Sequence, residues 1–298
     1  MIGENETFVY TDPGRENDPF ITDRSGVETI RDRIVAAIRR LVADADADGV
    51  VVAMSGGIDS TVTAALAVEA LGSDRVLGLG LPCHKADRPH VTEARTIAEG
   101  LGISFREIQL RPLLTAFEET VAAELEPEST ERSTERNRTI GNVIARLRMC
   151  CAYYAANRQS RLVLGTANRS ELLLGYFTKH GDGAADAYPI GDLYKTEVRA
   201  LAKRLGVPRR IVTKEPTAGF WADQTDAGEL GAPYDVIDPL LRRLVDERES
   251  IAEATAALEI DSRTARAIAS MYVETAHKRT TPRTPGIAGR ENCTGMDR

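Results

Sequence analysis

The chain has 298 residues, of which 42% are hydrophobic and 28% charged, and its formal net charge at pH 7 is −7. This composition is typical of a globular protein, and the excess of acids argues against a nucleic-acid partner held by bulk electrostatics. No apolar run approaches the ~20 residues of a membrane span and the N-terminus lacks a signal-peptide pattern, so we expect a cytoplasmic protein with no membrane contact.

Hydrophobic periodicity predicts the elements of the first half of the chain. Residues 1–24 are polar and contain Pro13 and Pro19, so we expect a flexible N-terminal segment. Val50, Val51 and Val52 form an apolar run typical of a buried parallel strand. The other predicted elements are helices over 27–45, 60–71, 90–101 and 113–125, strands over 76–81 and 103–110, and a polar loop over 83–89.

The second half is predicted in the same way. Residues 124–138 are polar without an apolar period and predict a loop, or polar helix ends, at the surface. Residues 213–233 are rich in proline and glycine, and a loop of this length inside a compact domain is a candidate lid. The remaining elements are helices over 140–157, 194–205, 250–258 and 262–277 and a strand over 161–164. We expect one domain over 25–282 and a disordered tail over 283–298.

Strands that alternate with helices predict an α/β fold, a Rossmann-like open parallel sheet with helices on both faces. Ligands of such sheets bind at the carboxyl ends of the strands, near a topological switch point. Ser55, Pro82 and Thr166 all follow predicted strands. We therefore expect three loops around one crevice.

The stretch SGGIDS follows the first predicted strand and opens a helix. Glycines at this turn let the backbone approach a ligand closely, and the backbone N–H groups and the helix N-terminus favour an anion such as phosphate. The carboxylate of Asp59 inside a phosphate site indicates a divalent cation, of which Mg²⁺ is the usual one. The motif is not a Walker A loop, because no lysine stands at the helix start. Its residues are Ser55, Gly56, Gly57, Ile58, Asp59 and Ser60.

A set of motifs in order resembles the NAD synthetases that use ammonia. The chain contains SGGIDS, GNVIARLRM, a block from Gly165 to Lys195, the stretch KEPTAGFWADQTDAGELG, and a late His277-Lys278-Arg279. The resemblance covers about 27–282 and implies an adenine nucleotide α-hydrolase-like fold. One departure is Ala227, where the family usually has Glu, which leaves open how the predicted lid closes.

The resemblance also implies a reaction. Deamido-NAD is amidated to NAD with ATP and ammonia as co-substrates, through an NAD-adenylate, with release of AMP and pyrophosphate. This is the last step of NAD biosynthesis, and the family works as a homodimer that requires Mg²⁺. The helix over 140–157 carries Met149, Tyr153 and Tyr154 near Arg146, and these could form the dimer interface or part of the core.

Functional residues follow from the same resemblance, position by position. Lys195 and Asp182 match catalytic positions, and Asp59 and Glu171 match the Mg²⁺ ligands. The ATP-binding positions are Ser55, Gly56, Gly57, Ile58, Asp59, Ser60, Arg88, Thr166, Lys195 and Thr217. The deamido-NAD-binding positions are Asn142, Arg146, Lys179, Asp186, Glu229, His277 and Lys278.

Plainer interpretations stand beside these. In isolation Asp59 would be a helix cap, Glu171 and Lys195 would be solvated charges, and His277 could bond carbonyls at a helix end. Another ATP-splitting enzyme, such as a tRNA thiolase or a GMP synthetase subunit, is a second hypothesis, and a protein that only senses ATP is a third. A separate glutaminase that supplies the ammonia also remains open.

Overall fold

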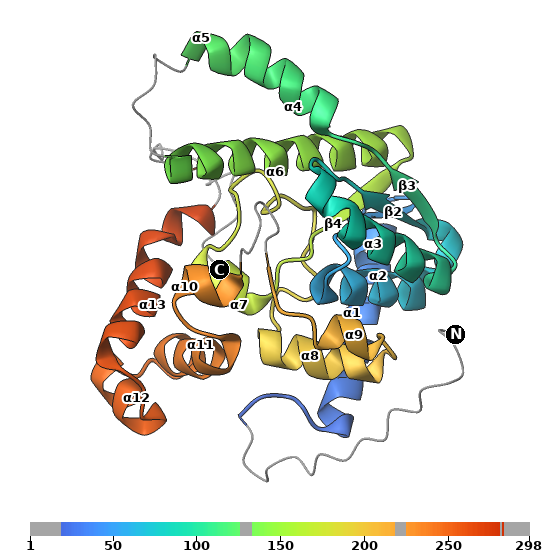
Figure 1. Cartoon of the computed structure of the whole chain (residues 1–298). Coiled ribbons are helices and arrows are strands. Elements are labelled where there is room, and N and C mark those ends of the chain that lie inside the picture. Colours follow the sequence, from blue (N-terminus) through green and yellow to red (C-terminus); the bar gives the residue numbers. More distant parts are fainter. Residues whose placement is uncertain (1–18, 126–132, 218–224, 281, 283–298) are drawn as a thin grey trace, which may run out of the picture.

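The computed structural model describes residues 19–125, 133–217, 225–280 and 282. Within them the chain forms a parallel sheet of order β3-β2-β1-β4 with helices on both faces, which confirms the predicted α/β fold (Figure 1). Val51 at the centre pairs with Leu77 on one side and Val163 on the other. The strands are β1 (Gly49–Ala53), β2 (Val76–Gly80), β3 (Ser104–Glu107) and β4 (Arg161–Leu164).

Helices make up most of the remaining described chain. In order they are α1 (Arg24–Asp44), α2 (Ile58–Leu71), α3 (Arg88–Leu101), α4 (Arg111–Phe117), α5 (Ala123–Leu125), α6 (Ser133–Arg158), α7 (Arg169–Leu174), α8 (Lys195–Arg204), α9 (Arg209–Val212), α10 (Asp226–Leu230), α11 (Tyr234–Leu241), α12 (Ile251–Leu258) and α13 (Ser262–Glu274). Short 3₁₀ turns span Ser73–Arg75, Lys85–Asp87 and Ala276–Lys278, and π-helical segments span Glu118–Ala122 and Arg242–Asp246.

The two faces of the sheet are covered by different helices because successive strand residues point to opposite sides. Val50 and Val52 pack into a core with α1, α2, α3, α8 and α9. Val51 and Val163 pack on the other face with α4 and α6. The run of three valines is fully buried, as the sequence predicts for a strand covered on both sides.

A third core is made by helices alone and lies beside the sheet (Figure 1). It joins α7, α11, α12 and α13, and its fully buried members include Ile237, Leu240 and Ile268. Tyr194, just before α8, belongs to this core, whereas Val198 of α8 packs against the sheet. The start of α8 is therefore fixed where two cores meet.

The sheet order creates one switch point. The chain passes from β1 outward to β2 and β3, and β4 then pairs on the opposite side of β1. The connections after β1 and β4 leave in different directions, so a crevice opens above these two strand ends. Ser55 and Thr166 both lie at this place, as predicted.

Two predicted loops contain helix. Over 124–138, where a loop or polar helix ends are predicted, residues 133–138 are a polar helix end, since they form the first turns of α6. This end is rich in Glu and Arg and exposed, so it has no apolar period, yet it extends a helix that is packed further on. The loop predicted over 213–233 contains α10, whose Gly228 N–H donates to the Thr225 hydroxyl at 3.1 Å. Trp221 and residues 218–224 lie outside the described residues, so the lid stays a prediction.

Other boundaries differ by a few residues. The strand predicted over 103–110 is shorter, although Ile108 N–H and Leu110 N–H still donate to Gly80 and Pro82 carbonyls. No helix was predicted over α11, although Tyr234, Ile237 and Leu240 repeat at helical spacing.

None of the described helices combines the length and apolar character needed to cross a membrane.

The described residues that precede residue 25 pack onto the domain. Phe20 is buried and meets the ring of Tyr194 edge to face, with 5.4 Å between ring centroids. Ile21 N–H donates to the Glu197 carboxylate at 3.0 Å. The division into 1–24, 25–282 and 283–298 stays a prediction, since residues 1–18 and most of the tail lie outside the described residues.

We expect Phe20→Ala to lower the free energy of unfolding by about 3 kcal/mol, because it removes a buried ring. The neighbouring Ile21→Ala variant is the control, since Ile21 is 39% exposed and its truncation should cost less than about 1 kcal/mol. Denaturant unfolding of both variants measures the difference. Equally small effects would mean that this segment does not contribute to the core.

Candidate active site

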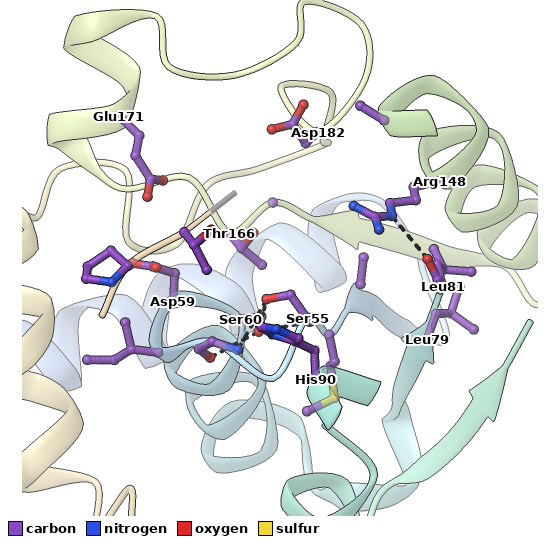
Figure 2. A pocket seen from close by; sticks show the side chains of 18 of the residues that line it. Ser55, Asp59, Ser60, Leu79, Leu81, His90, Arg148, Thr166, Glu171 and Asp182 are labelled. Carbon is purple, nitrogen blue, oxygen red and sulfur yellow. Dashed lines mark hydrogen bonds between the residues drawn. The ribbon is translucent and has the colours of Figure 1, made fainter. Parts of the chain in front are cut away.

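A cavity of about 290 Å³ lies at the carboxyl ends of β1, β2 and β4 (Figure 2). It is the crevice that the strand order predicts. Charged and histidine side chains from many elements line it: Asp59, Asp87, His90, Arg148, Glu171, Asp182, Lys195, Lys214, Glu215 and Asp226. Of the other predicted ATP positions, Ser55, Gly57, Ile58, Ser60, Thr166 and Thr217 line the cavity, whereas Gly56 and Arg88 do not.

The turn between β1 and α2 forms one wall. Gly56 has φ +75°, and a Cβ there would lie 2.3 Å from the His90 carbonyl oxygen, so both conformation and space require glycine. Ser55 N–H donates to the Ser60 hydroxyl at 3.2 Å, and that hydroxyl lies 3.2 Å from the Gly57 carbonyl, to which it donates. The first turn of α2 opens on the cavity, so its N–H groups and dipole favour an anion.

A buried ammonium joins two predicted metal ligands. Lys195 Nζ donates to Asp59 Oδ2 at 2.6 Å and to Glu171 Oε1 at 3.3 Å. The other oxygens of the two carboxylates accept from Asn168, whose side-chain amide bonds Asp59 at 3.0 Å and whose backbone N–H bonds Glu171 at 3.2 Å. Asn168 was not selected from the sequence, although it stands in the matched block after Gly165.

A third carboxylate belongs to the same group. Asp226 at the start of α10 is 4% exposed and accepts from the Tyr234 hydroxyl at 2.9 Å and the Tyr176 hydroxyl at 3.3 Å. The sequence analysis did not select Asp226, although it precedes Ala227 in the stretch QTDAGELG. Asp59, Glu171 and Asp226 therefore surround the single ammonium of Lys195.

The burial of these carboxylates around one ammonium shifts the pKa values of Glu171 and Lys195. Burial raises the pKa of Glu171 to about 8; Lys195 opposes this rise, and the Asp59 and Asp226 carboxylates add to it. Burial disfavours the charged form of Lys195, but the Asp59 and Glu171 carboxylates outweigh burial and raise its pKa above the usual value. Lys195 is thus a permanent cation, whereas the raised pKa of Glu171 favours its protonated, neutral form near pH 7.

The donor set fits a magnesium ion only in part. No group of three or more His, Cys, Asp or Glu is arranged around a metal position within the described ranges. Asp59 and Glu171 offer two hard oxygen ligands, and Mg²⁺ in nucleotide sites often has one or two carboxylates with phosphates and water as the rest. The two residues fit a cation that arrives with phosphate groups.

Asp182 and Arg148 line the cavity across from Asp59 and Glu171 (Figure 2). Asp182 accepts from Thr178 N–H at 2.8 Å, and burial raises its pKa although this bond and Arg148 oppose the rise. Arg148 of α6 donates from Nε to the Leu81 carbonyl at 3.1 Å. Arg148 lies in GNVIARLRM but was not selected from the sequence.

The predicted deamido-NAD positions do not line this cavity. Several meet around the loop after α7. Lys179 Nζ donates to the His277 carbonyl at 2.6 Å, and Arg146 donates to the Lys179 carbonyl at 3.2 Å. Lys278 Nζ donates to the Gly175 and Phe177 carbonyls at 2.7 and 2.8 Å, and burial lowers its pKa.

The other three predicted positions contact the edges of the same region. The Asn142 side-chain carbonyl accepts from the Thr178 hydroxyl at 2.7 Å, and Glu229 accepts from the Tyr176 hydroxyl. Asp186 accepts from Val163 N–H at 2.7 Å, which ties its loop to β4. The roles assigned to these residues stay predictions.

Comparison with known proteins identifies relatives over nearly the whole domain. Residues 30–282 match the family described as NAD synthase. The chain is 43% identical over 265 residues to the NH(3)-dependent NAD(+) synthetase of Methanosarcina mazei, an alignment that covers 88% of this chain and 99% of that protein.

Two solved structures are similar in fold. The NMN synthetase of Francisella tularensis matches with a TM-score of 0.75 and 32% identity over 88% of this chain and 99% of that one. The NH3-dependent NAD synthetase of Campylobacter jejuni, in complex with nitrate, matches with a TM-score of 0.70 and 28% identity over 87% and 98%.

We expect Asp182→Asn to stabilise the protein more at pH 8 than at pH 4. Because burial raises the folded-state pKa of Asp182, the wild type loses stability as pH rises from the unfolded pKa through the folded one, and an amide does not. Thermal unfolding at both pH values measures the change. Asp235→Asn, at a carboxylate 80% exposed, controls for the lost surface charge. An equal difference at both pH values would contradict the effect of burial.

Proposed function

The chain belongs to the NAD synthase family, and we propose that it amidates deamido-NAD to NAD with ATP and ammonia, releasing AMP and pyrophosphate. The observation that supports this chemistry is the buried Lys195 ammonium held between Asp59 and Glu171 beside an anion-binding turn. Such a group stabilises negative charge at a phosphate and keeps its own charge at all working pH values. ATP is a co-substrate of the family reaction.

The first step activates a carboxylate. An oxygen of the nicotinate carboxylate attacks the α-phosphorus of ATP, a new O–P bond forms, and the bond from that phosphorus to the bridging oxygen breaks. The turn from Ser55 to Ser60 binds the leaving pyrophosphate through N–H groups and hydroxyls. Lys195 binds the α-phosphate, whose equatorial oxygens carry the developing charge. The product is an NAD-adenylate, a mixed anhydride with AMP as a good leaving group.

The second step forms the amide. Ammonia attacks the acyl carbon, a C–N bond forms, the C–O bond to AMP breaks, AMP leaves, and the nitrogen loses one proton to solvent to give the neutral amide. The attacking nitrogen must be neutral, so an ammonium ion has to lose a proton first. Asp182 suits this role because burial raises the pKa of its carboxyl, which brings a base closer to neutral pH.

Magnesium belongs to the same proposal. Asp59 and Glu171 would hold it with phosphate oxygens of ATP, and it would supply positive charge that offsets the charge of the polyphosphate. Their carboxylates line the cavity on the side of the Lys195 ammonium. A cation would also take the place of the proton that the raised pKa of Glu171 favours near pH 7.

We also propose a homodimer, in the cytoplasm, with deamido-NAD bound near α6. Exposed apolar side chains support an interface on this side: Tyr154 of α6 is 70% exposed, and Leu113 and Leu125 of the adjacent α4 and α5 are 46% and 75% exposed. Met149 lines the cavity and Tyr153 donates to Asp186 at 3.2 Å. Of the three residues predicted at the interface, Tyr154 is therefore the one available to a second subunit.

A related substrate must be tested because of the similarity to an NMN synthetase. Nicotinic acid mononucleotide is the deamido form of NMN and carries the same carboxylate.

Two other hypotheses predict different products. An ATP sensor would bind ATP without releasing pyrophosphate, and a tRNA thiolase would release pyrophosphate only with tRNA.

We expect purified protein to form NAD, AMP and pyrophosphate in equal amounts from deamido-NAD, ATP, ammonium and Mg²⁺. Chromatography of the products measures this, with nicotinic acid mononucleotide in a parallel reaction. Formation of ADP in place of AMP, or preferential amidation of the mononucleotide, would refute the proposal.

We expect Asp59→Asn and Glu171→Gln each to lower kcat by about 100-fold or more while the fold remains intact, because each removes a charged ligand of the site. Initial rates across a range of Mg²⁺ concentrations and thermal unfolding measure the two effects. Asp32→Asn removes a carboxylate on α1 that is 67% exposed and serves as the control. A near-normal rate at low Mg²⁺ in either site variant would show that its carboxylate holds no metal.

A further inference from the structure

Lys214 lines the cavity next to the phosphate-binding turn and has no role in the chemistry described so far. It follows α9 and shares the cavity wall with Ser55, Gly57 and Ser60. Its segment is anchored on α3, because Arg210 of α9 donates to Glu93 of α3 at 2.8 Å. The backbone that carries Lys214 is thus fixed close to the anion-binding turn.

The ammonium of Lys214 is held by a histidine. Lys214 Nζ lies 3.2 Å from His90 Nδ1. An ammonium can only donate, so Nδ1 must accept and the ring must be neutral. Burial and then Lys214 lower the pKa of His90, while Asp87 and Glu93 oppose them and Arg148 adds a smaller lowering effect. The neutral tautomer is therefore the stable one near pH 7.

His90 also connects Lys214 to the turn. Its carbonyl oxygen is the atom that a Cβ at Gly56 would meet at 2.3 Å, so α3 packs directly on the turn. Figure 2 shows His90 on the same wall as Ser55 and Ser60. Lys214 is consequently held on the side of the turn where Gly56 lies, whereas Lys195 contacts Asp59 at the other end of the turn and Glu171 of α7.

The other two cations of the cavity wall are already engaged. Lys195 is bound to two carboxylates, and Arg148 donates to the Leu81 carbonyl and lies 3.7 Å from the Asp87 carboxylate. Within the described residues, the Lys214 ammonium is hydrogen-bonded to the neutral imidazole and to no carboxylate. Six acidic side chains line the cavity: Asp59, Asp87, Glu171, Asp182, Glu215 and Asp226. Burial raises the pKa of Glu171, Asp182 and Asp226, which favours their neutral forms. An entering polyphosphate gains most from a cation that no carboxylate of the described residues pairs with.

We propose that Lys214 is a further phosphate-binding residue for ATP, which binds the β- and γ-phosphates, and that His90 is the residue that positions it. The inference rests on the proposed function, because it assumes that ATP occupies this cavity. The two lysines then bind different phosphates. Lys195 stabilises the α-phosphate during attack, and Lys214 stabilises the pyrophosphate that leaves toward the turn from Ser55 to Ser60.

Direct binding to the full chain tests the role of Lys214. Calorimetry with Mg²⁺ measures the affinities for α,β-methylene ATP, inorganic pyrophosphate and AMP, so turnover is not needed. We expect Lys214→Met to weaken binding of the first two by about 10- to 100-fold, the effect of one charge-assisted contact, and to leave AMP binding within about twofold. Lys214→Arg, which keeps the charge, should recover most of the lost affinity.

Matched variants exclude a general effect of charge or folding. Lys203→Met removes the same charge from an exposed position on α8 and should bind all three compounds like the wild type. Lys214→Gln replaces Lys214→Met if the latter does not fold. Unchanged pyrophosphate affinity in the Lys214 variant, or an equal loss for AMP, would overturn the inference.

His90 is tested by replacing the accepting atom. Asparagine places a carbonyl oxygen near the position of Nδ1, so His90→Asn should keep pyrophosphate affinity close to that of the wild type. His90→Leu should lose affinity for pyrophosphate and not for AMP. Equal pyrophosphate affinity in the two variants would show that His90 does not position Lys214.

The outcome is separate from that of the proposed function. A wild-type protein that forms no NAD but binds pyrophosphate through Lys214 would refute the proposed reaction and leave this inference intact. A protein that forms NAD with unchanged ATP and pyrophosphate affinity after Lys214→Met would do the opposite.

Discussion

The burial of one ammonium among carboxylates is the constraint on which the rest of the site depends. Lys195 is 3% exposed and bonds Asp59 from the β1–α2 turn and Glu171 from α7. A buried charge is tolerated only with close partners, so these elements must meet at one point. Asp226, at the start of α10 within the candidate lid, also interacts electrostatically with Lys195. The geometry of the reacting centre is thus also a condition of stable folding.

The packing explains how a lysine at a helix start can be buried. Tyr194 belongs to the core formed by helices alone, and Val198, one turn further, belongs to the core on the sheet. Asp238 of α11 accepts from Thr196 N–H at 2.8 Å and from the Ser170 hydroxyl, which in turn accepts from Lys195 N–H at 3.0 Å. The first turn of α8 is therefore fixed from both sides, and the Lys195 side chain extends into the cavity between them.

The sequence predicted the parts of this molecule that local pattern controls. Val50 to Val52 could be recognised as a strand covered on both faces because the run is apolar without alternation, and SGGIDS could be placed at its carboxyl end. Alternation of strands and helices predicted the parallel sheet. Motif resemblance selected Asp59, Glu171 and Lys195, which the structure brings together. The start of α6 could not be placed between a loop and a polar helix end, because its first turns carry no apolar period.

The sequence by itself thus determined the fold class, the anion-binding turn and the residue types of the site, since these depend on periods and spacings within short stretches. The tertiary structure alone decided which titratable groups lie close enough to interact. Asp226 and Lys195 are separated by α8, α9 and part of the candidate lid, and His90 and Lys214 come from different helical units, so no local pattern reveals that they meet. Burial, too, appears only after packing. Burial raises the pKa of Asp182, which suits its proposed role as a base, and of Glu171, whose proton a bound cation would have to displace.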